Sequence, residues 1–159
     1  MTIGYYNSPI GRLTVAVEDA GVAGIWCEGQ KYYGATIKAG ASEGEHPLLS
    51  AVYNWLDNYF AGNNPDFTLP LLPASSPLAN NVRKAMLDIP YGCTVSYSEL
   101  AVQAGMPKAV RAVAAAVGRN PFLLLVPCHR VVGKDGSLTG YAAGLERKAY
   151  LLELERQSS

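Results

Sequence analysis

The sequence has few cysteines, few histidines and no long apolar run. None of its three cysteines, Cys27, Cys93 and Cys128, belongs to a C-x-x-C pair, so neither a disulfide framework nor a zinc motif is indicated. The two histidines, His46 and His129, add no ligand spacing, and we expect no metal. No stretch approaches the roughly 18 apolar residues of a membrane span, and the N-terminus has no signal-peptide pattern. These absences favour a globular protein of the reducing cytoplasm, away from membranes.

The sequence also lacks a net charge, but its charges are unevenly spread. Residues 1–79 carry three basic and seven acidic side chains, whereas residues 80–159 carry ten basic and six acidic ones. A stretch without any acidic residue lies between Glu99 and Asp135, and it contains Lys108, Arg111, Arg119, Arg130 and Lys134. Such a stretch suits a polyanion, although an ordinary solvated basic face has the same composition.

The first third of the chain predicts β-structure followed by one helix. Residues 12–18 and 22–27 are rich in β-branched and aliphatic residues and are separated by Asp19-Ala20-Gly21, which is typical of a hairpin or short meander. Apolar residues then recur at helical spacing from Leu48 to Phe60. We interpret this amphipathic helix as core and not as chemistry.

Prolines mark the middle of the chain. Residues 66–73 resemble an edge strand, and the following Ala74-Ser75-Ser76-Pro77 resembles a linker. We therefore predict an α+β fold with a boundary near residue 75. A small N-terminal α/β lobe with a short antiparallel sheet covers residues 1–75, and a mainly helical C-terminal lobe covers residues 76–159.

The C-terminal lobe contains a predicted helix-turn-helix. A first helix is expected over residues 77–88, capped by Ser76. Ser96 and Glu99 then form a capping box, which starts a second helix that runs to about Gln103. After a short turn, a further helix is expected from Pro107 to Val117. The last two helices suit DNA binding, although a packed helical hairpin has the same pattern.

The residues with the clearest chemistry follow a buried run at 122–126. Cys128 stands next to His129, and a thiol needs such a base or a positive potential to become a nucleophile at neutral pH. Glu153 and Glu155, in a predicted helix from Gly144 to about Arg156, are both candidates to orient the imidazole. The alternative is a buried, inert Cys128 beside a histidine that is satisfied in the core.

Several motifs resemble one family. They are residues 126–133 (Val-Pro-Cys-His-Arg-Val-Val-Gly), residues 89–92 with Ser96-Tyr97, residues 140–148, and residues 7–11 near the start. Together they resemble the O6-alkylguanine-DNA alkyltransferases, also called methylated-DNA–protein-cysteine methyltransferases. The likeness is close from about Ile89 to Glu155 and looser over the N-terminal lobe.

The resemblance implies a DNA repair protein that acts once and needs no cofactor. Cys128 would take the alkyl group from guanine O6, and from O4-alkylthymine, and keep it as an S-alkylcysteine. His129 would act as the base through a water molecule, and the resemblance selects Glu155 to orient it. The target nucleotide would be flipped out of the duplex. The substrate pocket would be lined by Val131, Tyr141, Ala142 and Leu123.

The same resemblance assigns the DNA-binding residues. Tyr97 would press on the target phosphate and hydrogen-bond the extruded base, Arg111 would fill the gap left in the stack, and Asn120 would act as a hinge before the active-site segment. Binding would use the minor groove of double-stranded DNA, by a monomer that can bind cooperatively. The basic stretch adds the phosphate-binding candidates Arg130, Lys108 and Arg119.

The chain departs from the family pattern next to the lobe boundary. Many relatives have Phe-Gln and Val-Trp where this chain has Leu78-Ala79 and Val82-Arg83, which makes Arg83 a candidate for an exposed position. Two other classes stay open from the residues alone: a DNA-binding regulator with a structural Cys128, and a cysteine hydrolase that acts on small acyl substrates.

Overall fold

A computed structural model describes residues 1–158. The N-terminal part of the chain forms a four-stranded sheet. The strand order is β3-β2-β1-β4, with antiparallel pairs except for β4, which pairs with β1 in parallel. The strands are β1 (Thr2–Ser8), β2 (Gly11–Glu18), β3 (Gly21–Cys27) and β4 (Ser42–Glu43). The predicted meander is confirmed, and β1 and β4 extend it. All seven residues of β3 are buried, so both faces of the sheet are covered at this strand.

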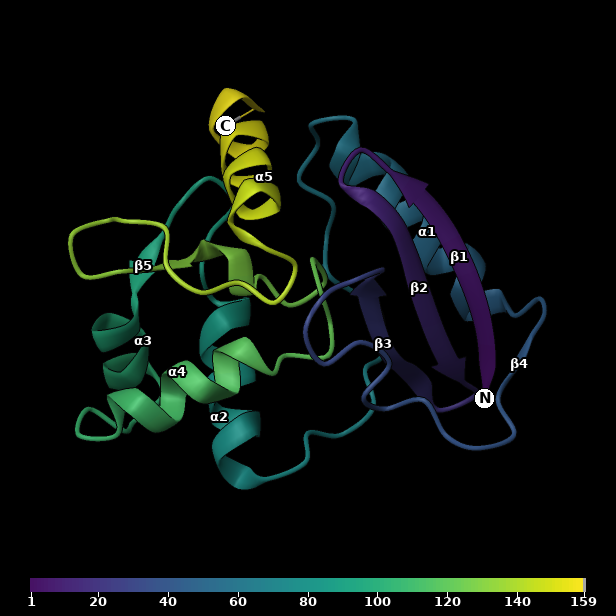
Figure 1. Cartoon of the computed structure of the whole chain (residues 1–159), viewed down its shortest axis with the longest axis horizontal. Coiled ribbons are helices and arrows are strands. Elements are labelled where there is room, and N and C mark those ends of the chain that lie inside the picture. Colours follow the sequence, from purple (N-terminus) through teal and green to yellow (C-terminus); the bar gives the residue numbers. More distant parts are fainter. Residues whose placement is uncertain (159) are drawn as a thin grey trace.

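One face of the sheet carries the helix predicted as core. Helix α1 (Pro47–Phe60) begins at His46, whose Nδ1 accepts a hydrogen bond from the Leu48 N–H at 3.0 Å. Its buried side chains, among them Val52 and Leu56, join those of β2 in the main hydrophobic core. Figure 1 shows α1 lying along the sheet on the side of the molecule that holds the N-terminus.

The C-terminal lobe consists of short helices and two very short strands. Its elements are α2 (Pro77–Leu87), β5 (Val95–Ser96), α3 (Tyr97–Gln103), α4 (Val110–Gly118), the 3-10 turn η1 (Cys128–Arg130), β6 (Val131–Val132) and α5 (Leu145–Ser158). Strands β5 and β6 pair in parallel. Ser76 caps α2, and both hydrogen bonds of the Ser96–Glu99 capping box are present. The helices α2, α3 and α4 gather on the side of the molecule away from the sheet (Figure 1).

Two local predictions need correction. The helix α4 begins at Val110 and not at Pro107, because residues 106–109 form a turn closed by the Ala109 N–H to the Met106 carbonyl at 3.0 Å. Residues 66–73 are not a strand: only Leu71 makes an isolated parallel bridge, to Val22. The prolines on both sides of that bridge have no N–H for a longer ladder.

The two lobes share one hydrophobic core. Buried residues of β2, β3 and α1 cluster with buried residues of α2 to α5 and with the run at 122–126. The backbone also crosses the junction, because the Ile25 N–H donates to the Pro121 carbonyl (2.8 Å) and the Leu123 N–H donates to the Ile25 carbonyl (3.1 Å). The active-site segment of one lobe is therefore paired to the sheet edge of the other.

Arg83 lies at this junction and is not exposed, contrary to the prediction. Its guanidinium stacks 4.8 Å from the Phe122 ring centroid and donates to the Leu72 carbonyl at 2.9 Å. An arginine stem and its planar head can cover apolar surface in this way. The α+β fold class is confirmed. In residues 1–158 no helix is both long and apolar enough to cross a membrane.

Candidate active site

Cys128 begins the turn η1 at the end of an irregular, buried segment. Residues 122–128 are all buried although none of them lies in a helix or strand before Cys128, and Leu124 adopts a left-handed φ of 71°. Buried backbone outside secondary structure needs other hydrogen-bond partners. Asn120 supplies several: its amide donates to the carbonyls of Phe122 (3.2 Å) and Val126 (3.1 Å), and its carbonyl oxygen accepts from the Phe122 N–H (3.1 Å).

The thiol of Cys128 is protonated in the free protein. Burial raises its pKa, because a thiolate loses solvation there, whereas the nearby amide of Asn120 and the charge of Lys148 act in the opposite direction. The other two cysteines differ. Cys27 is buried and donates to the Ile10 carbonyl, and Cys93 is exposed. The charge of Arg147 acts on the pKa of Cys27 in the same direction as the charge of Lys148 acts on that of Cys128, so the position next to His129 is what distinguishes Cys128.

His129 and Glu155 form a buried pair directly beside Cys128. Both side chains are fully buried, and His129 Nε2 lies 2.5 Å from Glu155 Oε2. Burial would raise the pKa of Glu155, but hydrogen bonds from His129 and Arg130 lower it to about 2. Burial lowers the pKa of His129, against the attraction of Glu155. At neutral pH the pair is therefore a neutral imidazole and a carboxylate.

The second imidazole nitrogen has no hydrogen-bond partner among residues 1–158. His129 Nδ1 is buried and makes no hydrogen bond to any described residue, the Cys128 sulfur included. Since Nε2 donates to Glu155, Nδ1 carries a lone pair and can accept a proton. The site thus joins a protonated thiol to a nearby base without a direct hydrogen bond between them.

The structure separates the two glutamates that the sequence left as alternatives. Glu153 is exposed on α5 and pairs with Arg156, while Glu155 faces the interior. The Glu155 carboxylate accepts hydrogen bonds from five atoms: His129 Nε2, Tyr59 OH, the Gly92 N–H, Arg130 Nε and Arg130 Nη2.

Arg130 faces the interior and not the predicted DNA surface. Its side chain is 11% exposed, bonds Glu155 Oε1 at 2.8 Å through Nε, and donates through Nη1 to the Ile89 carbonyl at 2.8 Å. Each of its three nitrogens bonds a group of the protein itself, because Nε and Nη2 donate to Glu155 and Nη1 donates to the Ile89 carbonyl. We correct the prediction accordingly: Arg130 belongs to the support of Glu155.

The loop at residues 139–142 is held by the buried Lys148. Lys148 is buried on α5, and its ammonium donates to the carbonyls of Val131 (2.6 Å), Thr139 (2.9 Å) and Gly140 (3.2 Å). Burial lowers the pKa of Lys148 to about 8. The half-buried Tyr97 hydroxyl also donates to the Thr139 carbonyl, at 3.1 Å. Tyr97 is thus placed beside the loop, as the first residue of α3.

The predicted substrate-pocket residues occupy different environments. Tyr141 and Ala142 lie in this loop, and the Tyr141 hydroxyl is buried without a partner among the described residues. Val131 is buried in β6. Leu123 is 1% exposed and belongs to the core that joins the lobes. The Ala142 carbonyl also accepts from the Lys31 N–H at 3.1 Å, so the N-terminal lobe contacts this loop.

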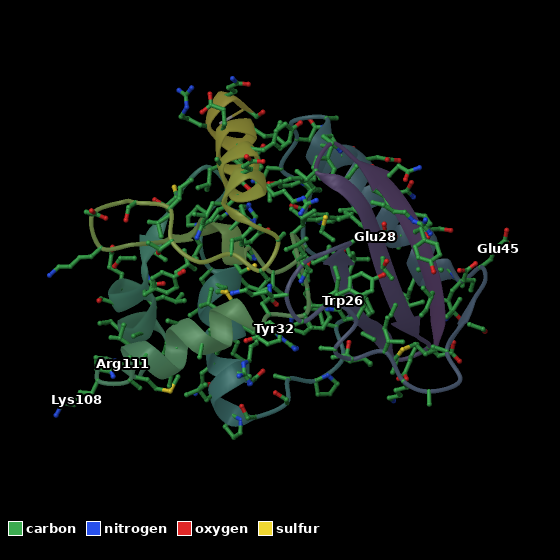
Figure 2. All side chains as sticks on the ribbon, in the orientation of Figure 1. Trp26, Glu28, Tyr32, Glu45, Lys108 and Arg111 are labelled. Carbon is green, nitrogen blue, oxygen red and sulfur yellow. The ribbon has the colours of Figure 1, made fainter. Side chains whose placement is uncertain are left out.

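The basic residues of the helix-turn-helix are exposed. Lys108 precedes α4 and Arg111 lies in its first turn, and Figure 2 shows both at the edge of the molecule farthest from the sheet. Arg119 follows α4, where its guanidinium lies 5.3 Å from the ring centroid of Tyr32. Lys108 and Arg111 are thus available to a large partner, whereas Arg119 already contacts the N-terminal lobe.

Sequence reasoning missed two side chains of this site, Tyr59 and Lys148. Tyr59 belongs to the helix that the sequence predicts as core, and Lys148 is the last residue of the motif at residues 140–148. The signal in the sequence is helical spacing, because Lys148, Leu151 and Glu155 fall on one face of the predicted helix. A lysine on the same face as the base's carboxylate is unusual, since lysine is almost never fully buried without a partner. No group of three metal-ligating side chains occurs within residues 1–158.

Comparison with known proteins gives a consistent result along the chain. Residues 77–157 match the family described as "6-O-methylguanine DNA methyltransferase, DNA binding domain", and residues 1–73 match "6-O-methylguanine DNA methyltransferase, ribonuclease-like domain". A methylated-DNA–protein-cysteine methyltransferase of Mycolicibacterium paratuberculosis is 43% identical over 153 residues, which cover 96% of this chain and 91% of the relative. One of Methanosarcina barkeri is 40% identical over 158 residues, covering 97% and 98%.

A solved structure is similar over the whole chain. The crystal structure of Mycobacterium tuberculosis OGT in complex with DNA superposes with a TM-score of 0.90 and 38% identity, covering all of this chain and 95% of that one. The arrangement of both lobes is therefore shared with that protein.

Proposed function

The chain belongs to the family of methylated-DNA–protein-cysteine methyltransferases, and from this premise we propose that Cys128 accepts the alkyl group of O6-alkylguanine in DNA. The observation that supports Cys128 is its place beside the buried His129–Glu155 pair, with an unoccupied lone pair on His129 Nδ1. The protein is a DNA repair transferase that carries its acceptor in its own sequence. We include O4-alkylthymine as a second substrate.

The reaction begins with removal of the thiol proton. Because His129 Nδ1 makes no direct hydrogen bond to the sulfur, a water molecule passes the proton from Cys128 to Nδ1. Glu155, on the other side of the ring, stabilises the imidazolium that forms. The neutral pair of thiol and imidazole becomes a thiolate and an imidazolium only when this transfer occurs.

The thiolate then attacks the alkyl carbon in line with the carbon–oxygen bond. A carbon–sulfur bond forms as the O6–carbon bond breaks, and the electron pair stays on guanine. Guanine takes up one proton and the imidazolium of His129 releases one, so that overall the alkyl group passes to sulfur and the thiol proton passes to guanine. A hydrogen bond to the departing base lowers this barrier. Tyr97 is the donor that we propose, once its hydroxyl exchanges the Thr139 carbonyl for the base. The thioether product has no leaving group that water can displace under these conditions, so each molecule reacts once.

The alkyl carbon lies inside a duplex, so the nucleotide must first be extruded. We propose that the helix-turn-helix of α3 and α4 enters the minor groove and that Arg111 fills the gap in the stack. Lys108, and Arg119 once it leaves Tyr32, bind phosphates. Asn120 acts as the hinge residue, and its hydrogen bonds hold the start of the active-site segment. Val131, Tyr141 and Ala142 line the pocket for the flipped base, with Leu123 behind them.

The wider organisation follows from the same function. We propose that the lobes divide near residue 75, which is supported by family matches that end at residue 73 and resume at residue 77. We expect a monomer that can bind DNA cooperatively. Since the substrate is DNA and the nucleophile a free thiol, we place the protein in the cytoplasm.

The test is to incubate the protein with a duplex oligonucleotide that contains one O6-methylguanine, and to measure intact mass and map peptides. We expect a gain of one methyl group, on Cys128, with no further turnover. Cys128→Ser should gain none, and Cys93→Ser should behave as the wild type. Repeated turnover of acyl substrates would indicate a hydrolase, and binding without a mass change would indicate a regulator. A methyl group on Cys27 or Cys93 would overturn the assignment.

A further inference from the structure

Among the described residues, Tyr59 is the one side chain of the N-terminal lobe that hydrogen-bonds Glu155. It lies near the end of α1, is 1% exposed, and is separated by 96 positions from its partner in α5. Its hydroxyl donates to Glu155 Oε2 at 2.6 Å and lies 3.4 Å from His129 Nε2. The hydrogen bond between Tyr59 and Glu155 has no role in the mechanism described above.

We propose that Tyr59 is a positioning residue for the alkyl transfer: it holds the Glu155 carboxylate in place and thereby keeps His129 in the tautomer that leaves Nδ1 free to take the thiol proton. This inference rests on the proposed function, because it concerns the same base. It assigns the N-terminal lobe a direct part in the proton transfer.

The geometry at Glu155 Oε2 supports this role. The phenol has one proton, and the 2.6 Å contact assigns it to Oε2. It therefore cannot also donate to His129 Nε2, which must carry its own proton to lie 2.5 Å from the same oxygen. Burial and the charge of Glu155 raise the pKa of Tyr59, so the phenol remains a donor at every working pH.

The two carboxylate oxygens of Glu155 are held from different sides. Oε1 accepts hydrogen bonds from Arg130 Nε at 2.8 Å and from the Gly92 N–H at 3.1 Å. Both donors belong to the C-terminal lobe, so this oxygen is held without a contribution from the N-terminal lobe. Oε2 accepts short hydrogen bonds from His129 and Tyr59 and a longer one, of 3.2 Å, from Arg130 Nη2. Without the phenol, the oxygen that faces the base loses the short bond that opposes rotation of the carboxylate.

The aromatic ring of Tyr59 is itself fixed by its neighbours. Trp55 stacks on it at 5.4 Å with an interplanar angle of 8°, and Phe60 and Tyr91 meet it edge-on at 5.3 Å and 6.3 Å. The imidazole of His129 also lies edge-on, at 6.3 Å. A phenylalanine should therefore keep the ring in place and remove only the hydroxyl.

The effect on the pH dependence has a definite sign. Removing a donor makes the Glu155 carboxylate a stronger acceptor for His129, which stabilises the imidazolium and raises the pKa of His129. Because the neutral imidazole is the base, the acid limb of the rate profile should move to higher pH. The loss of positioning adds a decrease in rate at all pH values, of about tenfold for one hydrogen bond to a charged group.

The experiment compares Tyr59→Phe with Tyr6→Phe. Tyr6 is a matched control, because its hydroxyl donates to the carboxylate of Asp57 on the same helix, away from His129. Two measurements are made: the single-turnover rate of methyl transfer from a duplex as a function of pH, and the NMR titration of the His129 ring nitrogens in the unreacted protein without DNA. Duplex binding without a lesion controls for altered DNA affinity.

We expect Tyr59→Phe to slow transfer about tenfold, to shift the acid limb and the His129 titration to higher pH, and to leave DNA affinity unchanged. Tyr6→Phe should leave rate, limb and titration as in the wild type. An unchanged profile in Tyr59→Phe, or equal effects of both substitutions, would overturn the inference. So would a wild-type spectrum that shows the proton on Nδ1. Failure of the wild type to transfer methyl would refute the proposed function instead, and the titration would still decide the role of Tyr59.

Discussion

The two lobes differ in how their backbones are satisfied. Three of the four strands in the sheet of the N-terminal lobe have seven, eight and seven residues and pair along their lengths. The C-terminal lobe has two strands of two residues each and a buried, irregular run that leads to Cys128. In that run Asn120 makes the hydrogen bonds that a ladder would make elsewhere. Irregular backbone thus brings polar side chains close to the reactive sulfur.

The lobes also differ in what they contribute to the site. The C-terminal lobe provides the nucleophile, the base and the exposed cations. The acidic N-terminal lobe provides hydrogen bonds to the residues that hold the active site in place. They come from the backbone of Ile25 and Lys31 and the hydroxyl of Tyr59. The regular lobe therefore supports the irregular one through these hydrogen bonds. The following substitutions test that division, beginning with the largest expected effect.

Glu155 is where the two lobes and the base meet. Glu155→Gln should slow alkyl transfer at least about 100-fold, because His129 loses the carboxylate that stabilises its imidazolium. It should also lower the free energy of unfolding by about 3–5 kcal/mol, since Arg130 remains buried without its counter-charge. DNA affinity should stay close to that of the wild type. Single-turnover kinetics, urea unfolding and binding to an unmodified duplex measure the three quantities.

Glu153→Gln is the matched control on the same helix. Glu153 is exposed and pairs with Arg156, and such surface pairs contribute little. We expect its rate and stability to match those of the wild type. A slow Glu153→Gln with an unaffected Glu155→Gln would mean that the wrong carboxylate has been assigned.

The low pKa of Glu155 predicts how stability depends on pH. The pKa falls from an ordinary 4.5 to about 2 in the folded protein, so the folded state favours the carboxylate. This contribution is fully present above pH 4.5 and is lost as the pH falls toward 2. Unfolding measured across this range should show a weaker acid dependence in Glu155→Gln than in the wild type. Parallel curves for the two proteins would contradict the assignment.

Local patterns predicted the regular parts of the molecule well. The caps at Ser76 and Ser96, the helix at 47–60 and the antiparallel strands depend on neighbours a few residues apart. The hydrogen bonds that hold Glu155 join residues that are far apart in the sequence. Tyr59 and Gly92 reach it across 96 and 63 positions, and Arg130 across 25, so only the folded chain shows that they meet. The same reason explains why Arg83 is not exposed and why Arg130 faces Glu155 and not the predicted DNA surface.

Arg111 tests the exposed side of the C-terminal lobe. If it occupies the gap left by the flipped nucleotide, Arg111→Ala should slow repair of duplex DNA about 10- to 100-fold, in line with an unstacking cost of a few kcal/mol. Reaction with free O6-benzylguanine, if the pocket admits it, needs no extrusion and should barely change. Arg111→Lys should be intermediate, because it keeps the charge but not the planar group. Equal slowing with both substrates would mean that Arg111 stabilises the pocket or the fold and does not fill the gap in the stack.

Lys148 tests the charge next to the irregular segment. Its ammonium lowers the pKa of Cys128 and binds three carbonyls around the loop. Lys148→Met should therefore raise the pKa of the thiol and slow alkyl transfer about tenfold. The thiol pKa is measured by the pH dependence of alkylation with iodoacetamide, in a background of Cys27→Ser and Cys93→Ser. An unchanged or lower thiol pKa would show that Lys148 acts only by holding the loop.

Arg83 tests the junction itself, where the smallest effect is expected. Its guanidinium joins Leu72, just before the linker, to the ring of Phe122 at the start of the active-site segment. Arg83→Ala should lower the free energy of unfolding by about 1–2 kcal/mol, from one hydrogen bond and one cation–π contact. Arg83→Lys should lose part of this, since lysine cannot stack in the same way. The rate of alkyl transfer should stay unchanged, because Ile25 still pairs with residues 121 and 123 and keeps the segment on the sheet edge. If urea unfolding shows the expected loss while the rate also falls tenfold, the sheet edge alone does not hold the active-site segment, and the regular lobe supports it through Arg83 as well.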